Sequence, residues 1–510
     1  MKQLMNLLLI SAGILFGACS GSGDNTGTTY YVDAIQGDDS ATGLSEEKAW
    51  KSLDRLQELT LQPGDSLLLR RGSIFQGVLE ITGEGTADRR VVVDAYGTGD
   101  KPCIQAPDGS RYAVQVKNSS YLTLQHLEVV NNGSERLAGR TGVKVLCDNY
   151  GTSHHLILNA LYIHDVNGSL VKQEGGGSGI LIENRGKEVI SVFDSLTIEN
   201  CVIRRCERNA MIWSGYWSRQ NWHPSTNTLV RYNLIEEVPG DGIVPIGCEN
   251  TLIEYNLMRN CPATLPQTEA AAGFWPWSCD NTTMQFNEVS DHKAPWDAQG
   301  FDSDYNCNNT TIQYNYSHDN EGGFVLICNS GSTDRRASVG NNGTVVQYNI
   351  SINDATRTRP TRQGMFSPTI HVPGPSENTR VNNNILHVHP KSAADVDRSI
   401  ITLDSWDGFA NNTTFRENLF YVPQPSEIRL YESTNTLFTG NYYLGQYIGK
   451  PTDREGKSGS SYYASLLDED ADGFASLTPL FEEVTVGDGA AKIKVVKRDA
   501  VHALFERMKE

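Results

Sequence analysis

Two aspartates that could act together in acid–base chemistry stand two residues apart, at Asp302 and Asp304. They follow Gly300 in a short segment that is typical of a β-strand, where alternate side chains point to the same face. Two residue rises put their Cα atoms about 6.5 Å apart. In glycoside hydrolysis, carboxylates about 5 to 5.5 Å apart suit a nucleophilic mechanism, and about 6.5 to 9.5 Å leaves room for a water. The spacing therefore predicts a hydrolytic acid–base pair and favours inversion of configuration.

Tryptophans surround this pair in the sequence. Aligning the glycine-headed strands predicts one outward-facing column through Trp275, Asp302, Val325 and Phe366, and a second column that contains Trp277 and Asp304. Flat indole faces stack on sugar rings, and their apolar bodies raise the pKa of a neighbouring carboxyl group. The alternative for any single tryptophan is packing beneath a loop. The predicted substrate-binding tryptophans are Trp275, Trp277, Trp296 and Trp213.

Further polar residues near the pair could supply another acid, a base or substrate contacts. Asp241 precedes a glycine-headed strand two coils below, and Asp297 and Lys293 are the other candidates for a third carboxylate or base. Arginines could bind a carboxylate or sulfate on a glycan. Each of these residues could instead be a solvated turn residue. The further predicted substrate contacts are Arg335, Arg336, His292 and His318.

A sequence repeat must position these residues. The motif Asn-Thr-apolar-x-x-Tyr-Asn recurs, most clearly at 227–233, 250–256 and 309–315, with a period of 23 to 40 residues. Such periods are typical of solenoids with loops of variable length. In a parallel β-helix successive coils stack about 4.8 Å apart, so asparagines in one column can hydrogen-bond along the axis. The last Asn falls at 200, 233, 256, 287, 315, 349, 384, 418 and 441, and the same frame covers His126 and Ala160.

The repeat predicts an all-β chain that forms a right-handed parallel β-helix of about 11 coils with an N-terminal cap and a C-terminal capping segment. The C-terminal cap is expected because an open coil would expose unpaired strand groups. Cys248, Cys279, Cys307 and Cys328 fall at matching places in successive coils and predict a buried thiol column. The expected divisions are a lipoprotein signal peptide at 1–19, a flexible tether at 20–28, a cap with the first coils at 29–115, the catalytic β-helix at 116–445 and a C-terminal cap at 446–510.

Charge and the N-terminal segment set the expected compartment and partners. The 61 acidic and 43 basic residues give a formal charge of −18, which opposes binding to nucleic acid. An apolar run at 7–16 after Lys2 is typical of a secretory signal rather than a membrane span. The sequence Phe16-Gly17-Ala18-Cys19 resembles a bacterial lipobox, which implies a lipid on Cys19. We expect a monomer anchored in the outer membrane, facing the periplasm or the cell surface; ordinary signal cleavage is the alternative.

The N-terminal part also resembles a known group of proteins. Tyr30-Tyr31-Val32-Asp33 and the segments 37–43, 49–53 and 61–72, together with the Asn repeats, resemble right-handed parallel β-helix proteins that act on polysaccharides. These are mostly glycoside hydrolases and polysaccharide lyases of glycan-degrading bacteria. The resemblance covers about residues 29 to 445 and implies a carbohydrate-active enzyme. The Gly-His-Gly motif of polygalacturonases is absent from this sequence, so pectin hydrolysis by that mechanism is disfavoured.

Three classes of function stay open. A glycoside hydrolase with Asp302 and Asp304 as its acid and base or nucleophile is favoured, and it needs no cofactor. The first alternative is a polysaccharide lyase, in which Lys293 or an arginine removes a proton beside a uronate carboxylate and the aspartates hold Ca²⁺. The second is a noncatalytic surface protein that binds glycans. The tryptophans beside the aspartates favour a hydrolase over a binder, and the lack of a lysine in either outward column near Asp302 favours it over a lyase.

Overall fold

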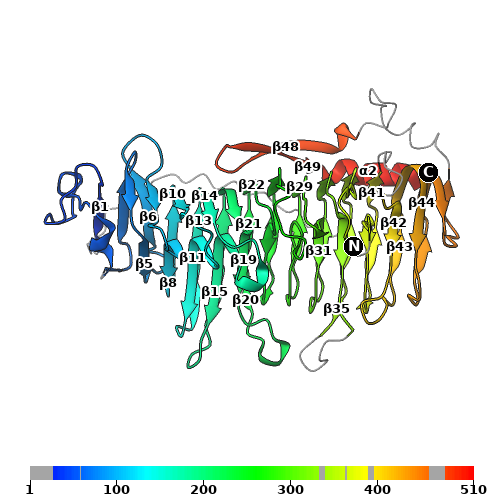
Figure 1. Cartoon of the computed structure of the whole chain (residues 1–510), viewed down its shortest axis with the longest axis horizontal. Helices are drawn as coiled ribbons and strands as arrows, with labels where there is room; N and C mark the ends of the chain where they lie inside the picture. The colour runs from blue at the N-terminus through cyan, green and yellow to red at the C-terminus, as the bar shows by residue number, and fades with distance from the viewer. Residues whose placement is uncertain are drawn as a thin grey trace, which may run out of the picture.

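The computed structural model describes residues 27–57, 59–331, 339–361, 364–388, 396–458 and 477–509. The chain forms an elongated solenoid in which short strands stack coil upon coil along the long axis (Figure 1). Three long parallel sheets run along it, and the predicted right-handed parallel β-helix is confirmed. The predicted signal peptide with Cys19, and the pair Arg335 and Arg336, lie outside the described residues.

The first sheet runs the length of the solenoid. It contains 14 strands among the described residues, and they pair in parallel in chain order. Its first strands lie within the segment predicted as an N-terminal cap, where the Asn motif is absent. The strands are β1 (Thr29–Val32), β3 (Ser66–Arg70), β6 (Val91–Tyr96), β9 (Leu122–Gln125), β13 (Ile157–Asn159), β17 (Thr197–Glu199), β21 (Leu229–Arg231), β25 (Leu252–Glu254), β28 (Thr283–Gln285), β32 (Thr311–Gln313), β36 (Val345–Gln347), β40 (Arg380–Asn382), β43 (Thr414–Arg416) and β45 (Leu437–Thr439).

The predicted asparagine ladder is confirmed between Asn233 and Asn441. Each Oδ1 accepts hydrogen bonds from the backbone N and the Nδ2 of the preceding member; Asn256 and Asn287, for example, are joined by a 3.0 Å Nδ2–Oδ1 bond. The ladder ends on Asp453, whose Oδ2 accepts from Asn441 Nδ2 at 2.9 Å. Its members are the buried side chains of Asn233, Asn256, Asn287, Asn315, Asn349, Asn384, Asn418 and Asn441.

Asn200 is not part of the ladder, which corrects the predicted frame. The backbone N of Cys201, not of Asn200, donates to Asn233 Oδ1 at 2.9 Å. Asn200 instead occupies the preceding position, with φ at 56°, where the clear repeats carry a tyrosine such as Tyr232 at 54°. His126 and Ala160 share this left-handed conformation and belong to the same preceding column. The reason is that the segment ending at Asn200 lacks the Tyr-Asn pair, so its single Asn takes the turn position.

The second sheet carries the C-terminal segment, and an aromatic stack occupies the turns that lead from the first sheet into it. Tyr255 lies 5.2 Å from Phe286, which lies 5.3 Å from Tyr314, measured between ring centroids. The strands are β4 (Ile74–Gln76), β7 (Cys103–Gln105), β10 (Glu128–Asn131), β14 (Tyr162–Asn167), β18 (Val202–Glu207), β22 (Leu234–Glu236), β26 (Leu257–Arg259), β29 (Glu288–Ser290), β33 (Tyr316–His318), β37 (Ile350–Ile352), β41 (Ile385–His387), β44 (Leu419–Arg429), β46 (Tyr442–Ile448) and β47 (Lys457–Ser458).

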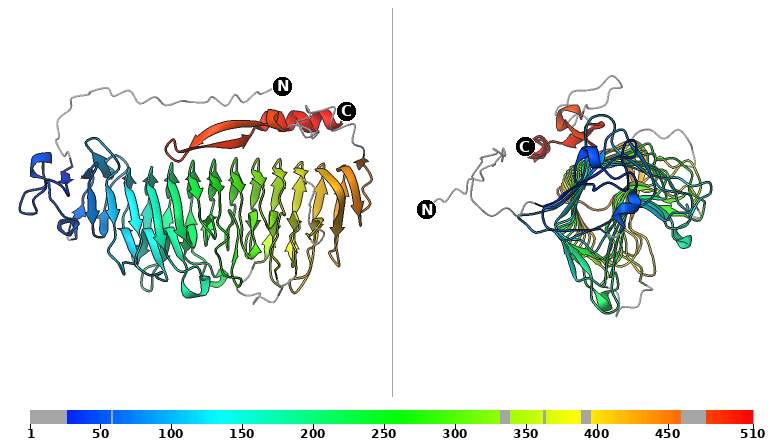
Figure 2. Two further views of the ribbon diagram at one scale, coloured as in Figure 1. Left: turned by 45° about the horizontal axis from the view of Figure 1, so that its top comes forward. Right: turned by 90° about the vertical axis from the view of Figure 1, so that its left-hand side faces the viewer.

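The C-terminal segment lies along the side of the solenoid, which corrects the predicted end cap. The antiparallel strands β48 (Phe481–Val486) and β49 (Ala491–Val496) and the helix α2 (Arg498–Lys509) follow the coils lengthwise (Figure 2). Asp488 forms a 3.0 Å ion pair with Lys101, near the other end of the solenoid. Ile493 packs against Leu257, and Phe505 belongs to a cluster with Ile350. The segment lies here because the second sheet presents an apolar outer face.

The third sheet positions the candidate site. Its strands are β2 (Thr60–Leu61), β5 (Leu79–Gly83), β8 (Tyr112–Lys117), β11 (Arg140–Asp148), β15 (Gly177–Arg185), β19 (Asn209–Ser214), β23 (Ile243–Val244), β31 (Gln299–Ser303), β34 (Gly323–Ile327), β38 (Ile370–His371) and β42 (Ser399–Thr402). Short bridges through Phe274 connect β23 to β31. One four-stranded parallel sheet contains β12 (Thr152–His154), β16 (Val192–Asp194), β20 (Ser225–Thr226) and β24 (Cys248–Glu249). Two two-stranded sheets are formed by β27 (Ala270–Ala271) with β30 (Trp296–Asp297) and by β35 (Asn341–Asn342) with β39 (Ser376–Glu377).

The interior is apolar and contains most of the predicted thiol column. Cys248, Cys279 and Cys307 stack in it, and the next position is taken by Asn341 rather than by Cys328. Short 3-10 helices lie in the loops: η1 (Glu46–Lys48), η2 (Leu53–Leu56), η3 (Lys172–Glu174), η4 (Arg219–Asn221) and η5 (Thr478–Leu480). Within the described part of the chain, no helix has the length and apolar character of a membrane span.

Candidate active site

Asp302 and Asp304 lie on the outer side of the third sheet, next to the predicted tryptophans. Asp302 N donates to the carbonyl of Phe274 at 3.0 Å, and Asp304 N donates to the carbonyl of Pro276 at 3.3 Å. This register puts Trp275 beside Asp302 and Trp277 beside Asp304, one coil apart, as the sequence predicts. The alternate residues of this segment, Phe301 and Ser303, are fully buried in the interior, as strand alternation requires.

On the other side of Asp302 the observed column differs from the predicted one. Asp302 pairs with Leu326, and Leu326 pairs with His371. The sequence alignment placed Val325 and Phe366 there, because it matched Gly323 with Gly300. In the structure Gly323 pairs with Gln299 instead, so the whole strand is displaced by one residue. In the next coil the strand is β38 and not the segment after Gly364, so His371 replaces Phe366 and lies on the same face two coils from Asp302, where the sequence predicts no histidine.

A cavity of about 240 Å³ opens at this face. Aromatic rings form much of its wall, and Trp406 lies 5.9 Å from His371 between ring centroids. Arg357 is buried and fixes the loop that carries Asp297, since its guanidinium donates to the carbonyls of Ala294 at 2.8 Å and Asp297 at 2.6 Å. The lining residues are Trp296, Asp297, Gln299, Gly322, Arg357, Thr361, Phe366, Ser367, Pro368, His371 and Trp406.

Asp302 is the most deeply buried carboxyl group of the pair. The residue is 4% exposed, and its Oδ1 has no hydrogen-bond partner among the described residues. Burial raises the pKa of Asp302 well above its usual value, and the charges of Asp297, Asp304 and Asp241 raise it further. Both effects favour the neutral form of the Asp302 carboxyl group.

Asp297 and Asp304 are partly accessible, although protein atoms surround both carboxyl groups. Burial raises the pKa of Asp297 to about 6, and the charge of Asp304 adds to this rise. Burial also raises the pKa of Asp304, against three opposing contacts. These are the Tyr305 N–H at 2.6 Å, the Cys328 thiol at 3.2 Å and the charge of Lys172. The two carboxyl groups thus differ in their affinity for a proton, which suits an acid and a base.

Asp241 does not face the cavity, which corrects its assignment as a third catalytic carboxylate. It is fully buried and forms an ion pair with Arg208, which is also fully buried. Burial raises the pKa of Asp241, but the charges of Arg208 and Lys172 outweigh this and lower it. Its Oδ1 accepts a 3.1 Å hydrogen bond from the indole Nε1 of Trp275. Asp241 therefore holds the ring of Trp275, which is itself 6% exposed and is not among the described residues that line the cavity, so neither side chain offers the open contact that the sequence predicts.

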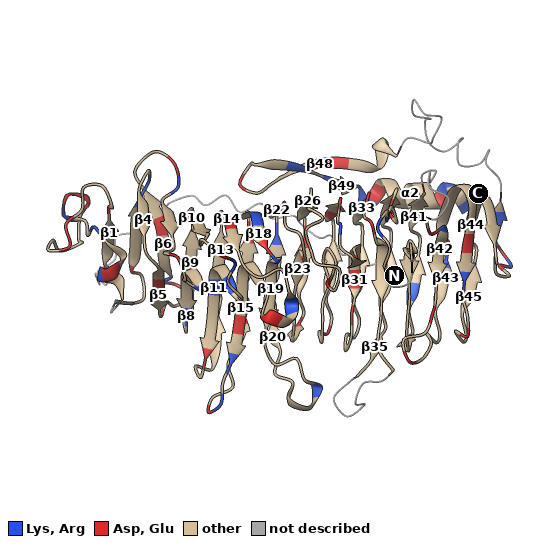
Figure 3. Ribbon diagram, viewed as in Figure 1, with Lys and Arg blue, Asp and Glu red and all other residues tan. Residues whose placement is uncertain are grey.

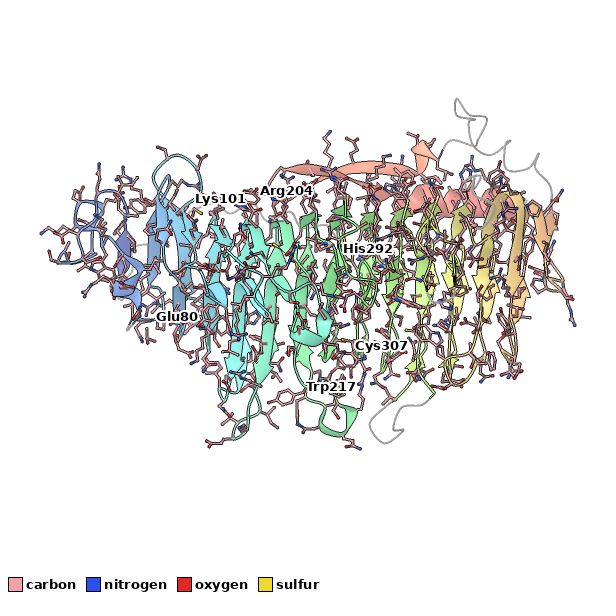
Figure 4. The ribbon with its side chains drawn as sticks, in the orientation of Figure 1. Glu80, Lys101, Arg204, Trp217, His292 and Cys307 are labelled. Atoms are coloured by element: carbon pink, nitrogen blue, oxygen red, sulfur yellow. The ribbon has the colours of Figure 1, made fainter. Side chains whose placement is uncertain are left out.

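Three other predicted contacts lie away from the cavity. Trp213 is 1% exposed, because it occupies an inward position of β19. His292 is fully buried and bonds the carbonyl of Gly240 through Nε2 at 2.9 Å (Figure 4). His318 belongs to β33 on the second sheet, between Glu288 at 3.1 Å and Asp319 at 2.7 Å. The charge of Lys293 opposes the rise in the pKa of the buried Cys261 thiol, and Lys293 is not among the described residues that line the cavity.

Several residues of the site come from loops that the repeat does not predict. Lys172 of η3 extends over the Trp275 ring, with Nζ 5.1 Å from the centroid. Trp217, on the loop after β19, stacks on Trp277 with centroids 5.3 Å apart. Basic and acidic residues are spread along the whole solenoid, so the charge at the site depends on local neighbours (Figure 3). No sequence signal identifies Lys172 or Trp217, since neither lies in a periodic position.

Comparison with known proteins points to glycan-active enzymes, although no protein-family model matches the chain. The lacto-N-biosidase of Bifidobacterium longum subsp. longum is 28% identical over 577 residues, which cover 94% of this chain and 33% of that protein. The chain thus spans about a third of the length of this curated relative. The solved GH136 lacto-N-biosidase of Eubacterium ramulus is 25% identical, with a TM-score of 0.57, over 84% of this chain and 67% of that chain.

A second solved structure shares the fold alone. A mannuronic acid-specific family 6 polysaccharide lyase from the human gut microbiota is 13% identical, with a TM-score of 0.50, over 94% of this chain and 99% of that chain. The similarities confirm the predicted resemblance to β-helix carbohydrate-active enzymes.

Proposed function

We propose that this protein is a glycoside hydrolase of the lacto-N-biosidase kind, with Asp297 and Asp304 as its catalytic acid and base. One observation carries the proposal. Asp297 lines an aromatic-walled cavity, and Asp304 is near enough for its charge to raise the pKa of Asp297; both carboxyl groups are partly accessible and have raised pKa values, in a chain that is similar over 94% of its length to a lacto-N-biosidase.

The two carboxyl groups divide the proton transfers. Asp297, with a pKa of about 6, is largely protonated only at mildly acidic pH, where it gives its proton to the glycosidic oxygen as the bond breaks. Asp304 ionises more readily than Asp297, because the Tyr305 N–H, the Cys328 thiol and Lys172 stabilise its negative charge. It takes a proton from the attacking water in an inverting reaction, or bonds to the sugar in a retaining one. Inversion remains a prediction.

Asp302 has a different role from the one that the sequence predicts for it. Its burial and the nearby charges of Asp297 and Asp304 favour its neutral form. A neutral carboxyl group avoids a third negative charge, which would raise the pKa of Asp304 further. We therefore assign Asp302 to positioning and electrostatics, and Asp297 takes its place in the catalytic pair.

The cavity supports a sugar substrate rather than a purely charged ligand. Trp296, Phe366 and Trp406 present apolar faces, and His371 and Gln299 supply polar edges. Pyranose rings have an apolar face and hydroxyl edges, so they match such a wall. The favoured substrates are glycans that carry a lacto-N-biose unit.

A digestion panel tests the reaction class. Purified protein is incubated with an aryl lacto-N-bioside, with oligosaccharides that carry lacto-N-biose, and with uronate polymers. We expect release of the disaccharide without ultraviolet absorbance, and no effect of EDTA. Unsaturated uronate products that disappear with EDTA would identify the calcium-dependent lyase, and no product from any substrate would favour the binding protein. Proton NMR of the first product identifies its anomer and decides between inversion and retention.

We also propose that the lipobox at Cys19 directs lipid attachment and membrane anchoring. Metabolic labelling with palmitate should mark the wild-type protein and not Cys19→Ala. Equal labelling of both proteins would refute the anchor.

A further inference from the structure

We propose that Trp217 forms an outer sugar-binding subsite, in which its indole stacks on a neutral hexopyranose of the glycan beyond the bond that is cleaved. The proposal rests on the proposed function, because it names a further part of the same site. Trp217 lies on the loop 215–224, an insertion between β19 and β20 at the lower edge of the solenoid (Figure 4).

The ring of Trp217 is exposed although an apolar partner is close. The residue is 48% exposed, and its ring stacks on Trp277 with centroids 5.3 Å apart and an interplanar angle of 19°. Trp217 therefore covers one side of the Trp277 ring, and the ring of Trp217 itself faces solvent. An aromatic ring held in this way offers a flat apolar surface for a ligand.

The stacked rings of Trp217 and Trp277 lie next to a proposed catalytic residue. Asp304 N donates to the carbonyl of Pro276, so Trp277 lies beside Asp304 on the neighbouring coil, about 4.8 Å away along the axis. Two stacked indoles thus lead outward from Asp304. A glycan bound at Asp297 and Asp304 can place its next sugar ring on them.

The loop is fixed by buried polar contacts rather than by the exposed ring. Arg219, whose side chain is 6% exposed, forms a 2.8 Å ion pair with Asp280 and lies 4.0 Å from the centroid of Trp222. Ser278 Oγ donates to the carbonyl of Trp217. Because the backbone is already ordered, binding a sugar costs little additional loop entropy. A loop that served only to cover the coil would gain more by burying Trp217.

The chemistry of the loop indicates a neutral sugar. The positive charge of Arg219 is already paired with Asp280, and it is oriented toward the coil. The surface of Trp217 offers apolar contact and no charge. Galactose and N-acetylglucosamine each have an apolar C–H face, so either fits this platform better than a uronate or a sialic acid.

The test compares substrates that reach Trp217 with one that does not. We measure kcat and KM for a tetrasaccharide and for an aryl disaccharide with wild type, Trp217→Ala and Trp217→Leu. Loss of one aromatic stacking contact should raise KM for the tetrasaccharide about tenfold, with kcat nearly unchanged. The aryl disaccharide should change less than twofold. Tyr431→Ala, at a 63% exposed aromatic residue far along the chain, is the matched control.

Direct binding keeps this test separate from the proposed reaction. Tetrasaccharide is titrated into Asp304→Asn protein with and without Trp217→Leu, and calorimetry gives Kd. A tenfold weaker Kd with Trp217→Leu supports the subsite even if no hydrolysis is found. An unchanged Kd, or an equal rise of KM for both substrates, overturns it. Trp217→Leu keeps an apolar side chain, so it covers the case in which alanine disturbs the loop.

Discussion

Trp275 and Asp241 are joined by a 3.1 Å hydrogen bond from the indole Nε1 to Oδ1. The bond connects the outer face of the solenoid with a buried ion pair, since Asp241 also pairs with Arg208. Arg208 in turn reaches Glu269 at 3.3 Å, and Lys172 covers the indole from the solvent side. The ring of Trp275 beside Asp302 is therefore held in a buried position by a network of charges.

Removal of the charge of Asp241 should destabilise the protein. Asp241→Asn retains an oxygen for Trp275 but leaves Arg208 with only Glu269 as a charged partner. Breaking a buried ion pair costs about 3–5 kcal/mol, so we expect a clearly lower thermal midpoint. The control is Glu483→Gln, which breaks an exposed 2.8 Å pair with Lys492 and should leave the midpoint unchanged. Equal midpoints for both variants would contradict the role of the network.

Breaking the asparagine ladder at a single coil should also destabilise the protein. Asn287→Ala removes the oxygen that accepts from both the backbone N and the Nδ2 of Asn256. Each buried donor left without an acceptor costs about 1–3 kcal/mol. Asn200→Ala, outside the ladder, should cost less. Thermal melts and hydrogen exchange at Asn256 measure the difference, and equal losses would show that the ladder does not carry the stability.

The contrast between Asn287 and Asn200 shows how far the sequence determines the structure. The ladder and the register of Trp275 against Asp302 are periodic, so the sequence predicts them. His371 is missed because the strand at this coil is β38, which begins at Ile370 and not after Gly364, and glycine positions alone do not show this. Lys172, Trp217 and the cavity wall belong to loops of variable length, whose folding depends on contacts such as Arg219 with Asp280. The site thus combines a predictable sheet with loops that only tertiary contacts position.

Cys328 should set the pKa of Asp304 through its thiol. Burial and nearby carboxylates raise the pKa of Cys328, so the S–H stays protonated and donates to Asp304 Oδ1 at 3.2 Å. Cys328→Ala removes this donor, which should raise the pKa of Asp304. Because the base must be ionised, the acidic limb of kcat/KM should move to higher pH. Cys328→Ser keeps a donor and should retain the wild-type limb. An unmoved limb in Cys328→Ala would exclude this role.

Asp302 should make the stability of the protein depend on pH. Its pKa in the folded state is raised, so the folded protein binds a proton that the unfolded chain releases above about pH 4. The stabilising effect of this proton is present below pH 4 and decreases as the pH rises toward the folded pKa. Asp302→Asn should therefore melt higher than wild type at pH 7, with the difference closing at pH 4. Asp88→Asn, at an exposed residue, is the control.

The final prediction separates the three aspartates by their kinetics. If Asp297 and Asp304 transfer the protons, Asp297→Asn and Asp304→Asn should each lower kcat about 100-fold or more. Asp302→Asn should lower it by less than about tenfold, because a protonated carboxyl group and an amide are both neutral and similar in shape.

The pH profile gives a second measure of the same assignment. With Asp297 as the acid, kcat/KM of the wild type should fall as the pH rises above about 6. Aryl substrates with a good leaving group need less protonation, so Asp297→Asn should recover part of its activity on them, whereas Asp304→Asn should not. A loss greater than 100-fold in Asp302→Asn, with near-normal rates in Asp297→Asn, would instead restore Asp302 and Asp304 as the catalytic pair, because the buried carboxyl group would then have to reach the substrate during the reaction.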